Sequence, residues 1–167
     1  TENGYTVSRI PSDFKFEGRG DAFVLDEYLV GSYGIRSDKE ALLYIASEFG
    51  LKPKIAELAD PKFYHLDTCF CSLNSDTVLI YAPAFKPEGV AIIKKLFKNV
   101  IEANKYEGAE LFACNATCPD GKNVVIQKGC VEVNAELEKL GFVVHEVETE
   151  EFLKSGGSVF CMKMMVW

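Results

Sequence analysis

The sequence predicts an α/β fold built from a strand–strand–helix–strand unit that occurs three times. Short apolar segments with strand character alternate with amphipathic helical segments in the same order in each unit. Four residues with reactive or polar side chains, Glu17, His65, Asn115 and Cys161, recur at intervals of 46 to 50 residues. A period of this size is typical of supersecondary units that lie side by side. If the units surround a common axis, an acid, a base and a thiol would meet there.

The three units are expected at approximately residues 17–60, 61–104 and 105–150, and a closing strand at 158–166 carries Cys161. The expected strands cover residues 22–25, 28–30 and 54–58 in the first unit, 65–73, 77–81 and around 100 in the second, and 111–114, 124–127 and 142–147 in the third. Each unit also contains one helix. Ser37 is expected to cap the first helix, Pro87 to open the second, and Gly141 to end the third.

The composition is that of one compact domain. The chain has 167 residues, 48% of them hydrophobic, and a net charge of −7, so it is long enough to bury a sizeable core. No apolar stretch approaches the length of a membrane span, and the acidic charge argues against binding to nucleic acid. The sequence therefore predicts a soluble protein without a membrane or nucleic-acid partner, and its charge suits a cationic small substrate.

The cysteine pattern argues against a metal site. The chain has only two histidines, and no CxxC pair occurs among its six cysteines, Cys69, Cys71, Cys114, Cys118, Cys130 and Cys161. Cysteines that serve as small buried residues are typical of a reducing compartment. We therefore expect a cytoplasmic protein with no metal and no organic cofactor. Its oligomeric state stays open, a homo-oligomer included.

Cys161 and His65 are the candidates for a nucleophile and its base. Cys161 follows a Ser-Gly-Gly-Ser segment, 155–158, in which the glycines let the backbone approach a ligand closely. A nucleophilic thiol needs a nearby base, and the second histidine, His145, lies in an alternating strand where an exposed polar residue is ordinary. Taken alone, Cys161 and His65 are each more often packing residues. Their matching places in the repeat favour a joint chemical role.

Three acidic residues are expected near the same axis. Glu17 and Asp21 bound a glycine-containing segment, and Asp67 follows His65 by two residues, on the same face of an extended strand. Each acid alone is more often a turn or cap residue. Carboxylates gathered around a thiol suit a guanidinium group, which offers planar, paired donors.

These segments resemble those of a known superfamily. They are FEGRGDA at 16–22, GIRS at 34–37, FYHLDT at 63–68 and KSGGSVFC at 154–161. In this combination and order they resemble the guanidino-modifying enzymes, which include dimethylarginine dimethylaminohydrolases, arginine deiminases and dihydrolases, and amidinotransferases. The resemblance extends from about residue 16 to residue 161. It implies a pentein-type α/β propeller of five modules, an active site on its axis and a covalent thiouronium intermediate.

The resemblance also implies catalytic roles. Cys161 would attack the guanidino carbon, His65 would protonate the departing amine and then activate water, and Glu17 would orient the guanidinium. The family's acid commonly lies in a Glu/Asp-Gly-Gly-Asp segment, whereas Arg19 adds a residue between the glycines here. Asp21 is therefore an alternative catalytic acid, although the 48-residue spacing favours Glu17.

Substrate-binding roles follow from the same comparison. Asp67 would hold the guanidino nitrogens, and Asp21 would also lie at the substrate. Arg36 occupies the place of an arginine that contacts the substrate carboxylate in the family. Asn115 has a position in the repeat but a weaker motif, and it is assigned to substrate binding on that position alone.

The chain supplies about three of the five modules that the resemblance implies. Residues 1–167 are therefore expected to form the C-terminal portion of one propeller domain, with an N-terminal portion provided by a separate chain or a cleaved fragment. The leading hypothesis is a hydrolase that acts on the C–N bonds of linear amidines such as arginine or a methylated or related arginine.

Three alternatives stay open at this point. An amidinotransferase would use the same intermediate, and a non-catalytic fragment would bind arginine without turnover. In the third alternative Thr1 acts as an N-terminal nucleophile with its own α-amine as base. Whether Thr1 is a natural cleavage end also stays open.

Overall fold

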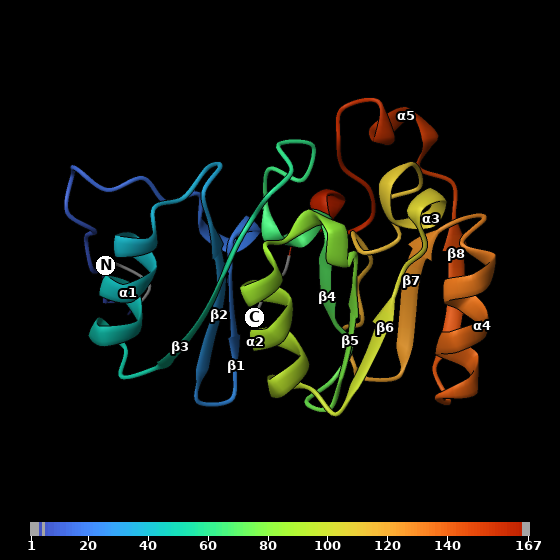
Figure 1. The fold of residues 1–167 in the computed structure, drawn as a ribbon, viewed down its shortest axis with the longest axis horizontal. Helices are drawn as coiled ribbons and strands as arrows, with labels where there is room; N and C mark the ends of the chain where they lie inside the picture. Colours follow the sequence, from blue (N-terminus) through green and yellow to red (C-terminus); the bar gives the residue numbers. More distant parts are fainter. Residues whose placement is uncertain (1–3, 5, 165–167) are drawn as a thin grey trace.

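The computed structural model describes residue 4 and residues 6–164, and these form three small sheets side by side (Figure 1). The strands are β1 (Ala22–Leu25), β2 (Tyr28–Tyr33), β3 (Lys52–Glu57), β4 (Phe70–Ser72), β5 (Thr77–Ile80), β6 (Asn99–Glu102), β7 (Asn123–Gln127) and β8 (Val143–Val147). The α-helices are α1 (Lys39–Glu48), α2 (Pro87–Leu96), α3 (Lys105–Ala109), α4 (Val131–Lys139) and α5 (Glu150–Leu153). Short 3-10 helices are η1 (Gly18–Gly20), η2 (Leu66–Thr68), η3 (Ala82–Ala84) and η4 (Phe160–Met162).

The repeated unit is present in full twice and in reduced form once. In the first two units an antiparallel hairpin is joined by a third, parallel strand after the helix, which gives the orders β1-β2-β3 and β4-β5-β6. In the third unit β7 and β8 pair in parallel, and the first strand is reduced to a single bridge between Thr117 and Val125. The predicted α/β class is therefore confirmed.

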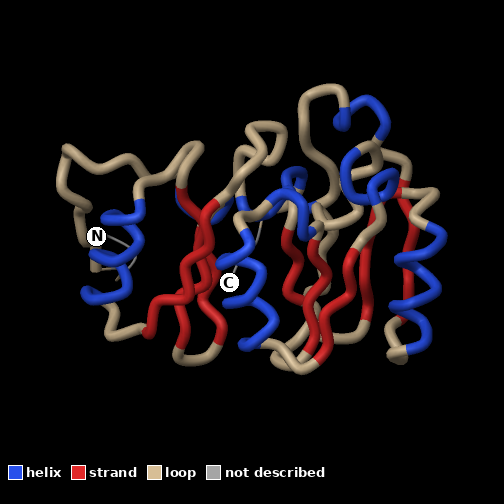
Figure 2. Tube along the Cα trace, viewed as in Figure 1, coloured by secondary structure: helices blue, strands red, loops and turns tan. Residues whose placement is uncertain are grey.

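The helices lie between and beside the sheets (Figure 2). Helix α1 packs on β2 and β3 of its own sheet, α2 packs on β3 of the preceding unit, and α4 packs on β6 and β8. Two glycines make these approaches close enough. A Cβ on Gly31 would lie 2.8 Å from Leu42 Cδ2, and a Cβ on Gly89 would lie 2.9 Å from the Ala56 Cβ. Because α2 belongs to the second unit and packs on β3 of the first, these adjacent units are packed together rather than merely linked.

Most of the core belongs to the second and third units. One continuous apolar cluster contains Phe63, Phe70, Leu79, Ile126 and Leu137, all fully buried. A smaller cluster around Leu29 and Leu42 holds α1 on the first sheet. None of the helices among the described residues is long and apolar enough to cross a bilayer.

Ser37 does not cap the first helix, contrary to the sequence prediction. Asp38 is the N-cap residue of α1, and it makes no side-chain capping bond; its carboxylate accepts a hydrogen bond from the Lys15 backbone instead. The Ser37 hydroxyl donates to the Asp21 carboxylate at 2.7 Å. The Ser37 oxygen accepts from the Glu17 N–H at 3.1 Å, so the hydroxyl is engaged both as donor and as acceptor outside the helix.

Three predicted strands are wrong or shorter than expected. Residues 111–114 form a turn after α3, in which Phe112 has a left-handed backbone (φ 49°). The expected extended run at 65–73 is interrupted by η2 before β4. The closing strand at 158–166 is absent as far as residue 164, because Phe160 donates its N–H to the Asn115 carbonyl and the chain then forms η4. Residues 165–167 and Thr1 lie outside the described residues.

Candidate active site

Glu17 and His65 form a short acid–imidazole contact between the first two units. Glu17 precedes η1 and His65 precedes η2, and Glu17 Oε2 lies 2.6 Å from His65 Nε2. This contact holds the pKa of the Glu17 carboxyl below its usual value, with the Arg36 charge acting in the same direction. The approach requires a glycine at position 20, because a Cβ there would lie 2.7 Å from His65 Nδ1.

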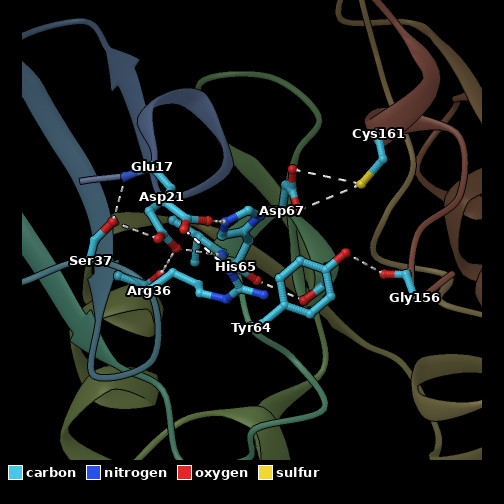
Figure 3. Close-up of polar contacts among 12 residues, drawn as sticks. Glu17, Asp21, Arg36, Ser37, Tyr64, His65, Asp67, Gly156 and Cys161 are labelled. Atoms are coloured by element: carbon cyan, nitrogen blue, oxygen red, sulfur yellow. Dashed lines mark hydrogen bonds and ion pairs between the residues drawn. The ribbon is translucent and has the colours of Figure 1, made fainter. Parts of the chain in front are cut away.

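Asp21 lies beneath this contact and is buried, with 1% of its surface exposed. Its Oδ1 accepts hydrogen bonds from the Ser32 hydroxyl at 2.7 Å and the Leu66 N–H at 3.0 Å, and its Oδ2 accepts from Ser37. The carboxylate therefore ties η1 and β2 to the turn that presents His65 (Figure 3). The Ser37 hydroxyl also accepts from the Glu17 N–H at 3.1 Å, which fixes the backbone of Glu17.

Asp67 faces the Cys161 thiol. The Cys161 Sγ lies 3.9 Å from Asp67 Oδ2 and 4.0 Å from Oδ1 (Figure 3). Burial raises the pKa of the Asp67 carboxyl to about 7; the Asp21 carboxylate adds to this rise, while His65 and Lys163 oppose it. Burial and the Asp67 charge likewise raise the pKa of the Cys161 thiol. Cys161 differs from the other five cysteines in that the residue is exposed.

Asn115 is fully buried and contacts both sides of this pair. Its Nδ2 donates to the Asp67 carbonyl at 2.8 Å and to the Cys161 Sγ at 3.3 Å. Its Oδ1 accepts from the Ser158 N–H at 2.6 Å and from the Cys161 N–H at 3.4 Å. The third unit therefore reaches the site through an amide that is bonded to protein on every side.

Arg36 and Tyr64 form the outer part of the site. Arg36 Nη1 lies 3.3 Å from Glu17 Oε1, and its guanidinium carbon lies 5.4 Å from the centre of the Tyr64 ring. The Tyr64 hydroxyl donates to the Gly156 carbonyl at 3.0 Å, which connects the second unit to the glycine-containing loop before Cys161. Tyr64, Lys163 and the serines at 32, 37 and 158 were not predicted as site residues, although Tyr64, Ser37 and Ser158 lie within segments that resemble the family.

Two hollows adjoin Cys161 and η4. One, of about 430 Å³, contains Cys161 itself and is lined by Tyr64, Phe152, Ser155, Gly157, Ser158 and Met162. The other, of about 650 Å³, is lined in part by Phe160 and Lys163, and Cys161 is not among its lining residues. Within the part of the chain that the structure describes, no group of three or more His, Cys, Asp or Glu side chains is arranged to hold a metal ion. The sequence-predicted residues Glu17, Asp21, Arg36, His65, Asp67, Asn115 and Cys161 thus lie in one connected network.

The family comparison agrees with this geometry. A family model described as N,N dimethylarginine dimethylhydrolase, eukaryotic, matches residues 5–167. The chain belongs to this family. The resemblance to guanidino-modifying enzymes that the sequence motifs indicated is therefore confirmed.

Individual relatives of this family match nearly the whole chain. The bifunctional arginine dihydrolase/ornithine cyclodeaminase ArgZ of Synechocystis sp. is 37% identical over 99% of this chain and 24% of its own length. The N(G),N(G)-dimethylarginine dimethylaminohydrolase of Mycobacterium tuberculosis is 37% identical over 90% of this chain and 49% of its own length. The crystal structure of the N-terminal domain of ArgZ bound to product superposes with a TM-score of 0.85, at 35% identity, and covers 96% of this chain and 59% of that one. The chain thus spans between a quarter and a half of the length of these curated relatives.

Proposed function

We propose that this chain carries the catalytic residues of a hydrolase that acts on the C–N bonds of arginine or of a methylated or related arginine. The observation that carries the proposal is that Cys161 is an exposed residue whose thiol lies 3.9 Å from the buried Asp67 carboxyl, in one network with the Glu17–His65 contact. A thiol nucleophile, an imidazole base and carboxylates that attract a cation are the groups that guanidinium hydrolysis requires. Relatives named for arginine dihydrolase and dimethylarginine dimethylaminohydrolase activity support it.

In the proposed reaction the Cys161 thiolate adds to the guanidino carbon and forms a tetrahedral adduct. His65 gives a proton to the departing nitrogen, the C–N bond breaks, and ammonia or an amine leaves a thiouronium on Cys161. His65 then removes a proton from water, the hydroxide adds to the same carbon, and the C–S bond breaks to release a ureido product. Arginine would give citrulline and ammonia by one such cycle. A second attack by Cys161 on the ureido carbon of citrulline would release a second ammonia, and hydrolysis of the resulting thiocarbamate would give a carbamate that loses carbon dioxide to leave ornithine.

The raised pKa values of Asp67 and Cys161 suit a cationic substrate. Both groups are partly or fully buried without a strong cation between them, so both favour their neutral forms. A guanidinium beside both groups would favour the carboxylate and the thiolate together, because a nearby positive charge lowers the pKa of both. The nucleophile would therefore form chiefly when substrate is bound.

The contacts favour Glu17 over Asp21 as the catalytic acid. Asp21 is 1% exposed and already accepts three hydrogen bonds from protein donors. Its bond from the Leu66 N–H holds the turn that follows His65, so its role is structural. Glu17 has an accessible side chain and touches His65 directly. Arg36 lies beside Glu17 at the outer edge, where we propose that it meets the substrate carboxylate.

We further propose that this chain forms about three modules of a five-module propeller and needs an N-terminal portion for activity. Its coverage of 24% of ArgZ and 49% of the Mycobacterium tuberculosis enzyme supports this proposal. Apolar side chains on β8 and nearby, such as Val143, Val147 and Phe152, are exposed and would be covered by further modules. A cytoplasmic location suits six cysteines that form no disulfide.

The test is a product analysis of this chain alone and together with its N-terminal portion. Arginine, methylated arginines and agmatine are supplied, and citrulline, ornithine, ammonia and methylamines are measured. We expect ureido product and ammonia or amine only when both portions are present. Formation of an amidino-glycine when glycine is added would identify an amidinotransferase, and arginine binding without any product would identify a non-catalytic fragment. Either result would contradict the hydrolase proposal.

A further inference from the structure

We propose that Asn115 is a positioning residue that holds the Cys161 thiol against the Asp67 carboxyl and does not contact the substrate. This inference deepens the proposed function, because it takes Cys161 as the nucleophile. It also replaces the substrate-binding role that the place of Asn115 in the repeat suggests.

The side-chain amide of Asn115 has no capacity left for a ligand. Both Nδ2 hydrogens are used, one by the Asp67 carbonyl at 2.8 Å and one by Cys161 Sγ at 3.3 Å. Its Oδ1 accepts from the N–H groups of Ser158 and Cys161 at 2.6 Å and 3.4 Å. An asparagine side chain offers two donors and two lone pairs, so all four are engaged. The residue is also fully buried.

The orientation of the amide is set by its partners. If the amide were rotated by a half-turn, Nδ2 would face the N–H groups of Ser158 and Cys161, which are donors themselves. The oxygen would then face the Asp67 carbonyl, which is an acceptor. Only the observed orientation matches donors with acceptors. The same geometry therefore fixes which end of the amide meets the thiol.

The backbone around Asn115 is built to present it. Phe112 adopts a left-handed conformation (φ 49°), which is costly for a bulky residue and persists where the surroundings enforce it. Its carbonyl accepts from the Asn115 N–H at 2.8 Å, and the Asn115 carbonyl accepts from the Phe160 N–H at 2.8 Å. Asn115 therefore accepts hydrogen bonds from the segment 158–161 through both its backbone carbonyl and its side chain.

These contacts have two chemical consequences. A donor on Sγ stabilises the thiolate, so the Asn115 amide lowers the pKa of Cys161, against the opposite effect of burial and of Asp67. The bond to the Asp67 carbonyl fixes the backbone from which the Asp67 carboxyl reaches the thiol. One side chain therefore acts both on the ionisation of the Cys161 thiol and on the position of the Asp67 carboxyl that faces it.

The test variant is Asn115→Asp in the full-length protein, because it keeps the Oδ1 acceptor and the size but replaces the donors by charge. The rate of Cys161 alkylation by iodoacetamide is measured against pH by mass spectrometry of the Cys161 peptide. We expect the apparent pKa of alkylation to rise by about one unit, which is a tenfold lower rate at pH values below it. We expect kcat to fall about tenfold or more, with KM changed less than about threefold.

Two further variants make the result specific. Asn99→Asp makes the same chemical change in β6, where Asn99 bonds Thr77, and it should leave the alkylation profile unchanged. Asn115→Ser removes the amide without adding charge and should shift the profile in the same direction by a smaller amount. An alkylation profile equal to wild type in both Asn115 variants would overturn the inference. So would a tenfold rise in KM at unchanged kcat, since that is the pattern of a substrate contact.

The alkylation readout also separates this inference from the proposed function. If wild-type protein turned over no guanidine but the Asn115 variants shifted the alkylation pKa, the positioning role would stand and the hydrolase proposal would fail. If the wild-type protein turned over a guanidine but the Asn115 variants kept the wild-type alkylation profile, the hydrolase proposal would stand and the positioning role would fail.

Discussion

The ionisation of the Asp67 carboxyl depends strongly on folding. Asp67 is 5% exposed, it faces a thiol rather than a cation, and burial raises its pKa from the ordinary value of 3.8 to about 7 in the folded state. A buried acid without a salt-bridge partner favours its protonated form. The residue therefore couples the stability of the empty site to pH.

Asp67→Asn is expected to stabilise the folded protein at neutral and alkaline pH. Because the pKa of Asp67 is higher in the folded than in the unfolded state, its contribution to stability is full below about pH 4 and is lost as pH rises to about 7. The variant cannot ionise, so its gain over wild type should grow across this window to on the order of 1–4 kcal/mol. Urea unfolding of the full-length protein at pH 5 and pH 8 measures it.

The exposed Asp26 at the tip of the β1–β2 hairpin provides the control. Asp26→Asn makes the same chemical change away from the site, so its difference from wild type should not vary with pH. A gain for Asp67→Asn that is the same at pH 5 and pH 8 would contradict the account.

The sequence predicted most of the residues of the network, but it did not predict which of them are accessible and which are buried and bonded only to protein. Spacing and motif placed Glu17, His65, Asp67 and Cys161 together, and the structure connects them. Spacing could not show that Asp21 and Asn115 are buried and bonded to protein, because burial depends on which units pack over them. Tyr64 was missed because its partner, Gly156, lies 92 residues away in sequence.

Among the elements, the loop between α5 and η4 determines where the thiol lies. It contains the glycines at 156 and 157, and Gly156 has a left-handed backbone (φ 80°). The loop is held at its middle by the Tyr64 hydroxyl and at its end by Asn115. It therefore depends on two side chains from other units rather than on its own secondary structure.

Tyr64→Phe should loosen this loop without unfolding the domain. The ring stays in place, but the 3.0 Å bond to the Gly156 carbonyl is lost, which costs about 1 kcal/mol locally. Hydrogen exchange measured by mass spectrometry should show amide exchange in residues 153–158 faster by about fivefold. Tyr33→Phe, which removes a comparable bond to Glu57 in the first sheet, should leave that loop unchanged. Equal exchange of the loop in wild type and Tyr64→Phe would refute its role as an anchor.

The helices were easier to predict than the strands that border the site. The helices α1, α2 and α4 follow apolar periodicity, and Pro87 begins α2 as expected. The predicted strand at 111–114 is a turn held by local hydrogen bonds, and the predicted closing strand, as far as residue 164, hydrogen-bonds to Asn115 after that turn instead of pairing with a sheet. Apolar composition could not reveal this, since it is shared by strands and by buried turns.

Across the whole molecule, the site lies where three units meet. The first contributes Glu17, the second His65 and Asp67, and the third Asn115, while Cys161 arrives on the segment that follows the third unit. The repeat period predicted this convergence because equivalent positions of side-by-side units face the same region. The number of modules in the complete domain stays a prediction, supported by the short coverage of the relatives.

The turnover of Cys161→Ser tests most directly whether Cys161 is the nucleophile of a guanidino hydrolase. Ammonia and ureido product from arginine and methylated arginine are measured for the full-length protein, with Cys118→Ser as the matched control, because Cys118 is half-buried and lies outside the site. We expect Cys118→Ser to keep wild-type turnover and Cys161→Ser to lose at least about a thousandfold. Wild-type turnover in Cys161→Ser would contradict the mechanism.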